Sequence, residues 1–340
     1  MALSNTTTYG DISPRTAGFA ARKMLERGQF DLVTERYGQA KPIPKKHTKT
    51  IKFRRFEALA RATAPLAEGV PPAGSKLIIT DVNATLEQYG DFTPITDVII
   101  DTHEDPVLME ATDVLGQQAA ETIEVVRIAV MRAGTNVFYA NNASGRSTVN
   151  SPPLRSDLRR IYRNFRKNKA QTISQIVKAS AKISTEPVAP AFFCLGHTDL
   201  DSDIRNMEGF VPIEQYSNSD KGVKAEIGKV DQFRFVLTPL FEPWLTAGTS
   251  STTFLSGGDI VTANAAADIY PLIVVAQNAY GIVPLQGKHS VTPMVVNPKP
   301  QVGDPLAQKG FVSWKMYQTA VILNHNWIGR LEAGATGVPT

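Results

Sequence analysis

The sequence has little of what a disulfide-stapled, secreted or membrane-embedded protein needs. A single cysteine, Cys194, stands among 340 residues, so no disulfide forms within the chain and no metal site is built from thiolates alone. The longest apolar stretch, residues 271–285, is interrupted by Gln277 and Asn278 and is shorter than the roughly 20 residues of a membrane-spanning helix. The first thirty residues lack the apolar core of a signal peptide. We therefore expect a chain made in a reducing cytoplasm, with no membrane partner.

Motifs for catalysis are missing as well. The sequence contains no Gly-x-Ser-x-Gly and no Gly-x-Gly-x-x-Gly, and its five histidines form no metal-spaced pair. Residues 281–289 resemble a P-loop, but five residues separate the glycines, one of them is proline, and histidine follows the lysine. The acidic run at 199–203 lacks the glycine and glutamate that a calcium loop requires. We predict a protein that is not an enzyme, with no catalytic residue, cofactor or metal ion.

Charge is distributed in blocks, although the formal net charge is only +4. Residues 1–66 carry 13 basic and 5 acidic residues, whereas residues 67–130 carry 2 and 12. Residues 131–182 carry 11 and 1, and residues 183–340 carry 10 and 14. Such blocks indicate complementary contacts between segments or between copies of the chain. A solvated surface is the alternative interpretation of any one block.

The amino-terminal part predicts an arm followed by an extended hairpin. Residues 1–12 are polar and have no periodicity, and residues 13–28 have the pattern of a short, weakly amphipathic helix. Strand-like runs at 48–59 and 76–88 flank a loop that is rich in proline and glycine. Few large apolar residues lie in these runs, so we expect most of the hairpin to project from the body.

Apolar residues at helical spacing predict two helices. The longer helix extends from Asp105 to Gly134, and its apolar face recurs every three or four residues over about 42 Å. That face comprises Leu108, Ala111, Leu115, Ala119, Thr122, Val126, Val130 and Ala133. The second helix spans about 153–169, with Leu154, Leu158, Ile161 and Phe165 as its buried stripe. Beyond residue 185 we expect a short helix capped by Thr198, a surface excursion at 239–268, and strands at 191–195, 233–237, 270–275, 282–285 and 311–323.

The second helix also carries a strongly basic face. Its candidate contact residues are Arg155, Arg159, Arg160, Arg163, Arg166 and Lys167. Asp157 is the only acidic residue among them, which predicts a polyanionic partner. That partner is either nucleic-acid phosphate or the acidic segment 67–130 of a neighbouring copy, and the closely matched charges of the two blocks favour the neighbour. A solvated helix face is the remaining alternative.

Several motifs then occur in a consistent order over residues 9–330. They are Pro42-Ile-Pro-Lys-Lys, Phe53-Arg-Arg-Phe, Ala62-Thr-Ala-Pro-Leu-Ala-Glu-Gly, Gln88-Tyr-Gly-Asp-Phe, Ile95-Thr-Asp, Leu115-Gly-Gln-Gln-Ala-Ala, Ala225-Glu-Ile-Gly, Phe233-Arg-Phe, Tyr270-Pro, Ala279-Tyr-Gly and Gly310-Phe-Val-Ser-Trp-Lys. In this order the series resembles the tailed-phage major capsid proteins of the coliphage N-four type. The resemblance implies the α+β Hong Kong-97 capsid fold. It implies an N-terminal arm at 1–47, an E-loop at 48–98, a P-domain at 99–184 and 309–340 with a spine helix at about 106–133, and an A-domain at 185–308.

The same resemblance implies a structural protein of the virion that assembles into hexamers and pentamers of an icosahedral head shell. Expected partners are other copies of the chain, packaged double-stranded DNA bound without sequence preference, a portal protein, and a scaffold or cement protein. In the E-loop we expect inter-subunit contacts at Arg54, Arg55, Glu68, Glu87 and Asp91. The rival interpretations are a nucleic-acid-binding protein that uses helix 153–169, and an α/β enzyme.

Overall fold

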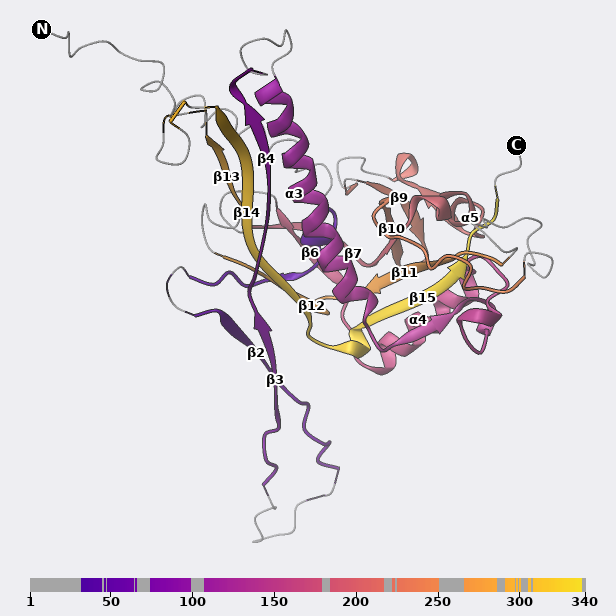
Figure 1. Ribbon diagram of the computed structural model, residues 1–340. Helices are drawn as coiled ribbons and strands as arrows, with labels where there is room; N and C mark the ends of the chain where they lie inside the picture. The colour runs from indigo at the N-terminus through magenta and orange to yellow at the C-terminus, as the bar shows by residue number, and fades with distance from the viewer. Residues whose placement is uncertain are drawn as a thin grey trace, which may run out of the picture.

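The computed structural model is an α+β structure with two large sheets and a projecting hairpin (Figure 1). It describes residues 32–44, 46, 48–63, 65, 74–98, 107–178, 184–216, 222, 223, 225–250, 266–285, 291–296, 298, 300, 305, 306 and 308–337. The helix predicted at 13–28, the residue Glu68 and part of the excursion at 239–268 lie outside these described residues.

A five-stranded sheet and the long helix α3 (Val107–Arg132) form the elongated part of the molecule (Figure 1). The strands are β1 (Gln39–Ala40), β12 (Tyr280–Pro284), β14 (Lys309–Ile322), β13 (Val291–Val296) and β4 (Glu87–Thr96). Helix α3 covers one face of this sheet, where Leu115 and Ile123 pack with Trp314. The predicted strand 311–323 is confirmed, and it forms the centre of this sheet.

An eight-stranded sheet forms the larger body. Its strands are β5 (Val137–Tyr139), β15 (Ile328–Gly334), β11 (Ile269–Val275), β7 (Ser184–Gly196), β10 (Phe233–Leu237), β9 (Glu226–Val230), β8 (Phe210–Pro212) and β6 (Ile173–Lys178). Every residue of β11 is buried, because the sheet is covered on both faces and a strand covered on both sides is apolar throughout. Cys194 is fully buried in β7, as its apolar surroundings predict.

Helix α4 (Arg155–Lys167) covers one face of the eight-stranded sheet, and the end of α3 covers the other. Leu158, Ile161 and Phe165 of α4 are buried as predicted, but Leu154 is 36% exposed, because it lies before the helix at the N-cap position. Both sheets contain strands from the segments assigned above to the P-domain and to the A-domain, so those domain boundaries stay a prediction.

The long helix is confirmed, but its buried face was predicted wrongly in its second half. Leu115 and Ala119 are buried, whereas Val126 and Val130 are half-buried and Ala133 is exposed. The buried residues of this half are instead Ile123, Glu124, Arg127, Ile128 and Met131. The face changes because α3 passes from the five-stranded sheet to the core beside the eight-stranded sheet, which Ile128 and Met131 enter.

The hairpin consists of β2 (Thr50–Phe56) and β3 (Ile79–Thr85), paired antiparallel in a two-stranded sheet. It extends away from the body, at the opposite end of the molecule from the start of α3 (Figure 1). The hairpin is shorter than the predicted 48–98, because β4 pairs with β14 along its whole length and so belongs to the five-stranded sheet.

Short helical turns complete the structure at η2 (Thr34–Arg36), η3 (Ala140–Asn142), η4 (Arg146–Thr148), η5 (Thr198–Leu200), α5 (Asp201–Arg205), η6 (Ile213–Gln215) and η9 (His325–Trp327). The cap predicted at Thr198 lies one residue earlier. His197 Nδ1 accepts a hydrogen bond of 3.1 Å from the backbone N–H of Asp199, because Thr198 already lies within the turn.

Candidate inter-subunit surfaces

The hairpin arginines that we predicted to contact a neighbour are paired within their own chain. Arg54 forms two hydrogen bonds of 2.8 and 2.9 Å with the Asp81 carboxylate across the strand pair, and this guanidinium lowers the pKa of Asp81. Arg55 pairs with Glu57 at 2.7 Å and also donates to the backbone carbonyl of Leu323, at the foot of the hairpin. The Arg54–Asp81 pair joins the two strands in register, and neither arginine offers unpaired charge.

Exposed apolar side chains are the feature of the hairpin that sequence reasoning missed. Phe56, Leu59, Leu77, Ile78 and Ile79 are between 47% and 63% exposed. They gather at the outer end of β2 and β3, where no second layer covers the strands. The three consecutive apolar residues at 77–79 were the available signal, because they interrupt the alternation of a half-buried strand.

Glu87 and Asp91, also predicted for the hairpin, lie on β4 in the five-stranded sheet. Glu87 accepts a hydrogen bond of 2.9 Å from the Tyr89 hydroxyl. Asp91 accepts one of 2.7 Å from Gln118 of α3, and this hydrogen bond lowers the pKa of the Asp91 carboxyl. Asp91 therefore links β4 to α3, whereas the contact of Glu87 stays within β4, and both acids belong to the five-stranded sheet rather than to the hairpin.

The face of the five-stranded sheet that points away from α3 carries a second apolar patch. Phe92, Met294 and Phe311 are 64%, 38% and 37% exposed and line a hollow of about 620 Å³. Ser313 lies opposite both Phe92 and Met294 in the strand pairing. The Ser313 hydroxyl is buried and has no hydrogen-bond partner among the described residues. A buried unpaired hydroxyl beside exposed aromatic rings is unusual for a surface that stays in water.

The root of the arm is held by a buried carboxylate that sequence reasoning also missed. Glu124 of α3 is 1% exposed and accepts hydrogen bonds from the backbone N–H of Val33, the N–H of Thr34 at 2.9 Å and the Thr34 hydroxyl at 2.5 Å. Tyr280 of β12 donates to the Thr34 carbonyl. Burial raises the pKa of Glu124, and the nearby Arg127 and the three donors act in the opposite direction. The arm is thus fixed where it enters the body.

The basic face of α4 divides into a paired half and an unpaired half. Arg155 donates to Asp231 at 2.7 and 3.2 Å, and Arg159 adds a contact of 3.3 Å to the same carboxylate. Arg160 donates to Asn142 at 2.6 Å and to the backbone carbonyl of Tyr139. These three side chains are therefore used within the fold.

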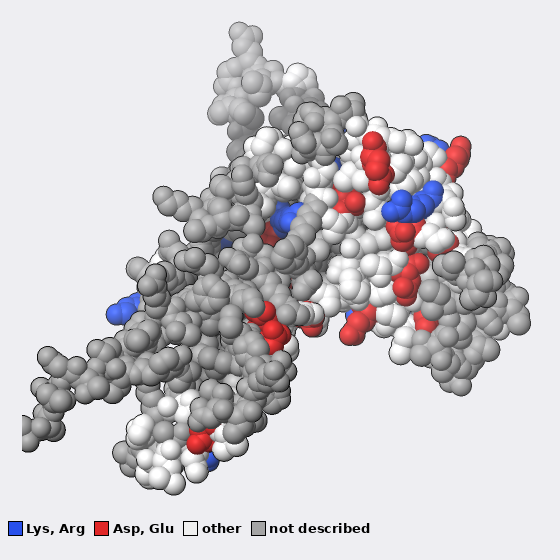
Figure 2. Space-filling view, turned by 90° about the horizontal axis from the view of Figure 1, so that it is seen from above, with Lys and Arg blue, Asp and Glu red and all other residues white. Residues whose placement is uncertain are grey.

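The other half lies at the carboxyl end of α4. Arg163 and Lys167 are exposed and have no ion-pair partner among the described residues, and Arg166 donates to the Tyr162 hydroxyl at 3.0 Å. Helix α4 lies low in Figure 1, away from the face drawn in Figure 2, where acidic and basic side chains lie beside each other with uncharged surface between them. Unpaired positive charge is therefore concentrated at this end of α4.

Comparison with known proteins identifies the family. A family model described as "Phage capsid protein" matches residues 79–331, which includes most of both large sheets and the whole of α3. The chain belongs to this phage capsid protein family. It is also 25% identical over 269 residues to the major capsid protein of Pseudomonas phage KPP21. That match covers 74% of this chain and 66% of the relative, just under two thirds of the relative's length.

Solved structures agree on the fold. The capsid of Ralstonia phage GP4 superposes with a TM-score of 0.67 at 8% identity, covering 91% of this chain and 92% of that one. A chain of the cyanophage Pam1 capsid gives a TM-score of 0.58 at 11% identity, covering 86% and 87%. The Hong Kong-97 capsid fold implied by the ordered motifs is thereby confirmed.

Membership of a capsid family also confirms the expectation of a structural protein rather than an enzyme, and gives no support to the nucleic-acid-binding alternative. Among the described residues, no group of three or more His, Cys, Asp or Glu side chains is arranged to hold a metal ion. No helix in the described part of the chain is long and apolar enough to cross a membrane.

Proposed function

We propose that this chain is the major capsid protein of a tailed phage, and that its copies assemble into the hexamers and pentamers of an icosahedral head shell. The observation that carries this proposal is the match to the capsid family over residues 79–331, across both sheets. The finished protein belongs to the virion and is made in the host cytoplasm. The capsid names of the relatives support the same role.

The two apolar surfaces support assembly through unlike contacts. One patch lies at the outer end of the hairpin, and the other lies around Phe92 and Phe311 on the five-stranded sheet, whose strands β4 and β14 extend away from the hairpin (Figure 1). A chain that exposes two different apolar surfaces can join its copies head to tail. Such contacts close into a ring when the rotation from one copy to the next divides a full turn. Rings of this kind are capsomers.

We assign the projecting hairpin as the E-loop and α3 as the spine helix of the P-domain, and most of the eight-stranded sheet as the A-domain. Because Arg54 and Arg55 are paired within the hairpin, its contacts with neighbours come mainly from the apolar side chains near Phe56 and Ile78. Burying such side chains contributes about 1.5–3 kcal/mol each, so a few suffice to order the hairpin on assembly.

Packaged double-stranded DNA is the partner we propose for the unpaired end of α4. Arg163, Arg166 and Lys167 present positive charge that no described acidic residue neutralises. Guanidinium and ammonium groups bind phosphate without reading base sequence, as a shell that encloses any genome requires. A portal protein and a scaffold or cement protein are further proposed partners of the assembled head.

Electron microscopy of the purified full-length chain tests the function. We expect closed shells or ring-shaped capsomers in the images, and a sedimentation coefficient far above that of a single chain. A chain that stays monomeric at high concentration and retards DNA in a gel would contradict the proposal and favour the nucleic-acid-binding alternative.

A further inference from the structure

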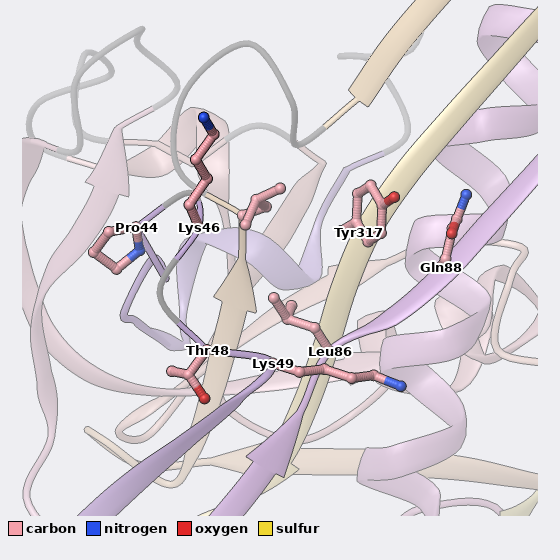
Figure 3. A pocket seen from close by; sticks show the side chains of 8 residues that line it. Pro44, Lys46, Thr48, Lys49, Leu86, Gln88 and Tyr317 are labelled. Carbon is pink, nitrogen blue, oxygen red and sulfur yellow. The ribbon is translucent and has the colours of Figure 1, made fainter.

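A pocket of about 440 Å³ lies at the foot of the hairpin, where four segments of the chain meet. It is lined by Pro44, Lys46, Thr48, Lys49, Leu86, Gln88, Leu285 and Tyr317. Leu86 and the Tyr317 ring form an apolar floor, and the side chains of Lys46 and Lys49 extend outward on different sides of the hollow (Figure 3). The site therefore combines apolar surface with two ammonium groups at its rim.

Neither ammonium group has an acidic partner among the described residues, and no acidic residue lines the pocket. The two arginines of the neighbouring strand β2 are engaged, Arg54 by Asp81 and Arg55 by Glu57. A pocket with an apolar floor and unpaired lysines fits a peptide that carries both aliphatic side chains and carboxylates.

The chain itself contains one segment of that description. Residues 97–105 read Asp-Val-Ile-Ile-Asp-Thr-His-Glu-Asp, and no other window of nine residues holds four acidic residues. The same window carries three consecutive aliphatic residues, Val98, Ile99 and Ile100.

A copy cannot place this segment in its own pocket. Gln88 lines the pocket and Asp97 follows β4, so nine extended residues separate the two by about 30 Å along the strand. The segment is tethered at both ends, to the end of β4 and to the start of α3 at Val107, which lie at the same end of the molecule (Figure 1). Ten residue steps tethered in this way extend at most about 16 Å from that end, which is too short for the distance to the pocket. The occupant must therefore come from a second copy.

We propose that the pocket beside Lys46 and Lys49 receives the acidic segment 97–105 of a neighbouring copy. The contact is head to tail, because pocket and segment are different surfaces of one chain, and it is additional to the apolar contacts of the hairpin. It rests on the proposed shell function, and it gives the acidic block at 67–130 a partner other than the arginine face of α4.

Cysteine cross-linking in assembled particles tests the contact directly. Cys194 is the chain's single cysteine and is fully buried, so introduced thiols are the ones that react. Particles of the Lys49→Cys, Asp101→Cys double variant should give a ladder of covalent oligomers on a non-reducing gel after mild oxidation. The matched control is Lys49→Cys with Glu208→Cys, whose carboxylate is 88% exposed on the larger body; it should stay monomeric on the gel.

Charge reversal supplies an independent measurement. Lys46→Glu with Lys49→Glu should abolish most particle formation, and adding Asp101→Lys with Glu104→Lys should restore it. Particles without a cross-linked ladder, an equal ladder in the control, or a combined variant that assembles no better than the lysine variant would each overturn the pocket contact while leaving the shell function standing. Absence of particles from the unmodified chain would overturn both.

Discussion

The β2–β3 hairpin and the eight-stranded sheet contain strands of the same length that differ sharply in burial. Strands β2, β3 and β11 have seven residues each. In the hairpin Phe53 and Ala84 are the buried residues, whereas every residue of β11 is buried. The hairpin keeps its register through the Arg54–Asp81 ion pair, while β11 is held between two apolar layers.

The difference shows which part of the chain is stable alone. Phe53 and Ala84 pack with Val283 of β12 where the hairpin meets the body, but its outer part has no second layer. A two-stranded ribbon of this kind is marginally stable in water, and exposed ion pairs add little. A strand covered on both faces is stabilised by burial alone. The body is therefore a folded unit before assembly, whereas the outer part of the hairpin depends on contacts with other copies for its stability.

Two truncations give the largest expected contrast, because they separate the arm from the body. Removing residues 1–30 leaves Thr34 and Tyr37 in place, so the body should melt as the full chain does but fail to close shells. Removing residues 1–38 also removes Tyr37, whose ring stacks on Phe193 at 4.3 Å. Loss of a buried aromatic side chain costs about 3–5 kcal/mol, so this truncation should be largely unfolded.

Thermal melting and electron microscopy of both truncations check this contrast. Normal shells from the shorter truncation would show that residues 1–30 are only a tail. An unchanged melting temperature for the longer truncation would show that the arm root is not part of the core.

A proline in α3 should break the connection between the two sheets. Val126→Pro removes the helical hydrogen bond from residue 126 to residue 122 and clashes with the preceding turn, at a cost of about 3 kcal/mol or more. Val125→Ala is the matched control, because Val125 is 46% exposed and its replacement should change stability by less than about 0.5 kcal/mol. Denaturation with urea distinguishes the two variants. Equal unfolding midpoints would contradict the role of α3 as the connecting beam.

Replacing the buried carboxylate at the arm root should have a smaller, pH-dependent effect. Glu124→Gln keeps an oxygen for the N–H groups of Val33 and Thr34, but its NH2 group cannot accept the hydrogen bond of the Thr34 hydroxyl, and the loss should cost about 1–3 kcal/mol. Burial raises the pKa of Glu124, so folding takes up a proton in the range between the unfolded and folded values. The stability of the unmodified chain should fall as the pH rises through that range, whereas the Gln variant has no such group.

The difference in unfolding free energy between the two proteins should therefore shrink as the pH rises above the ordinary carboxyl pKa of 4.5. Urea denaturation across this range measures it. A difference that grows with pH would mean that Arg127 and the three donors outweigh burial and that the carboxylate is held ionised.

Local patterns in the sequence predicted the elements well where one periodicity held throughout. The strand at 233–237 and the helix ending near residue 132 follow from spacing alone. The buried face of α3 did not, because the helix changes the sheet it packs on between Ile123 and Ile128. Such a change depends on tertiary placement, which spacing does not record.

The candidate contacts show the same division. Charge at Arg54 and at Arg155 was visible in the sequence, but their partners Asp81 and Asp231 lie 27 and 76 residues away. Glu124 belongs to the same acidic block as many surface residues, and burial alone distinguishes it. Which charges are free for a neighbour is therefore a property of the fold.

Hydrogen exchange sharpens the comparison of hairpin and body without changing the protein. Amides of β11 should be equally protected in the unassembled and the assembled chain, because both of its faces are covered within one copy. Amides of β2 and β3 should gain protection on assembly. Equal protection of the hairpin in both states would contradict its dependence on neighbouring copies.

The basic end of α4 should give the smallest effect on the folded chain and the most selective effect on the particle. Arg159→Glu places a carboxylate beside Asp231, but Arg159 is 61% exposed, so the loss of stability should stay below about 1 kcal/mol. Arg163→Glu alters a residue with no ion-pair partner among the described residues and should leave the melting temperature unchanged.

The double variant Arg159→Glu with Arg163→Glu distinguishes between the two partners that the charge of α4 allows. If the helix faces DNA, empty shells should form normally and packaging should fail, because each lost phosphate contact weakens binding and its salt dependence. If it faces an acidic segment of a neighbour, empty shells should already fail, since like charges would then meet across the interface. Normal shells with normal packaging would show that this face of α4 contacts neither partner and is simply exposed to solvent. We expect the first result, because the acidic segment at 97–105 has its own pocket beside Lys46 and Lys49, whereas Arg163 and Lys167 have no described acidic partner.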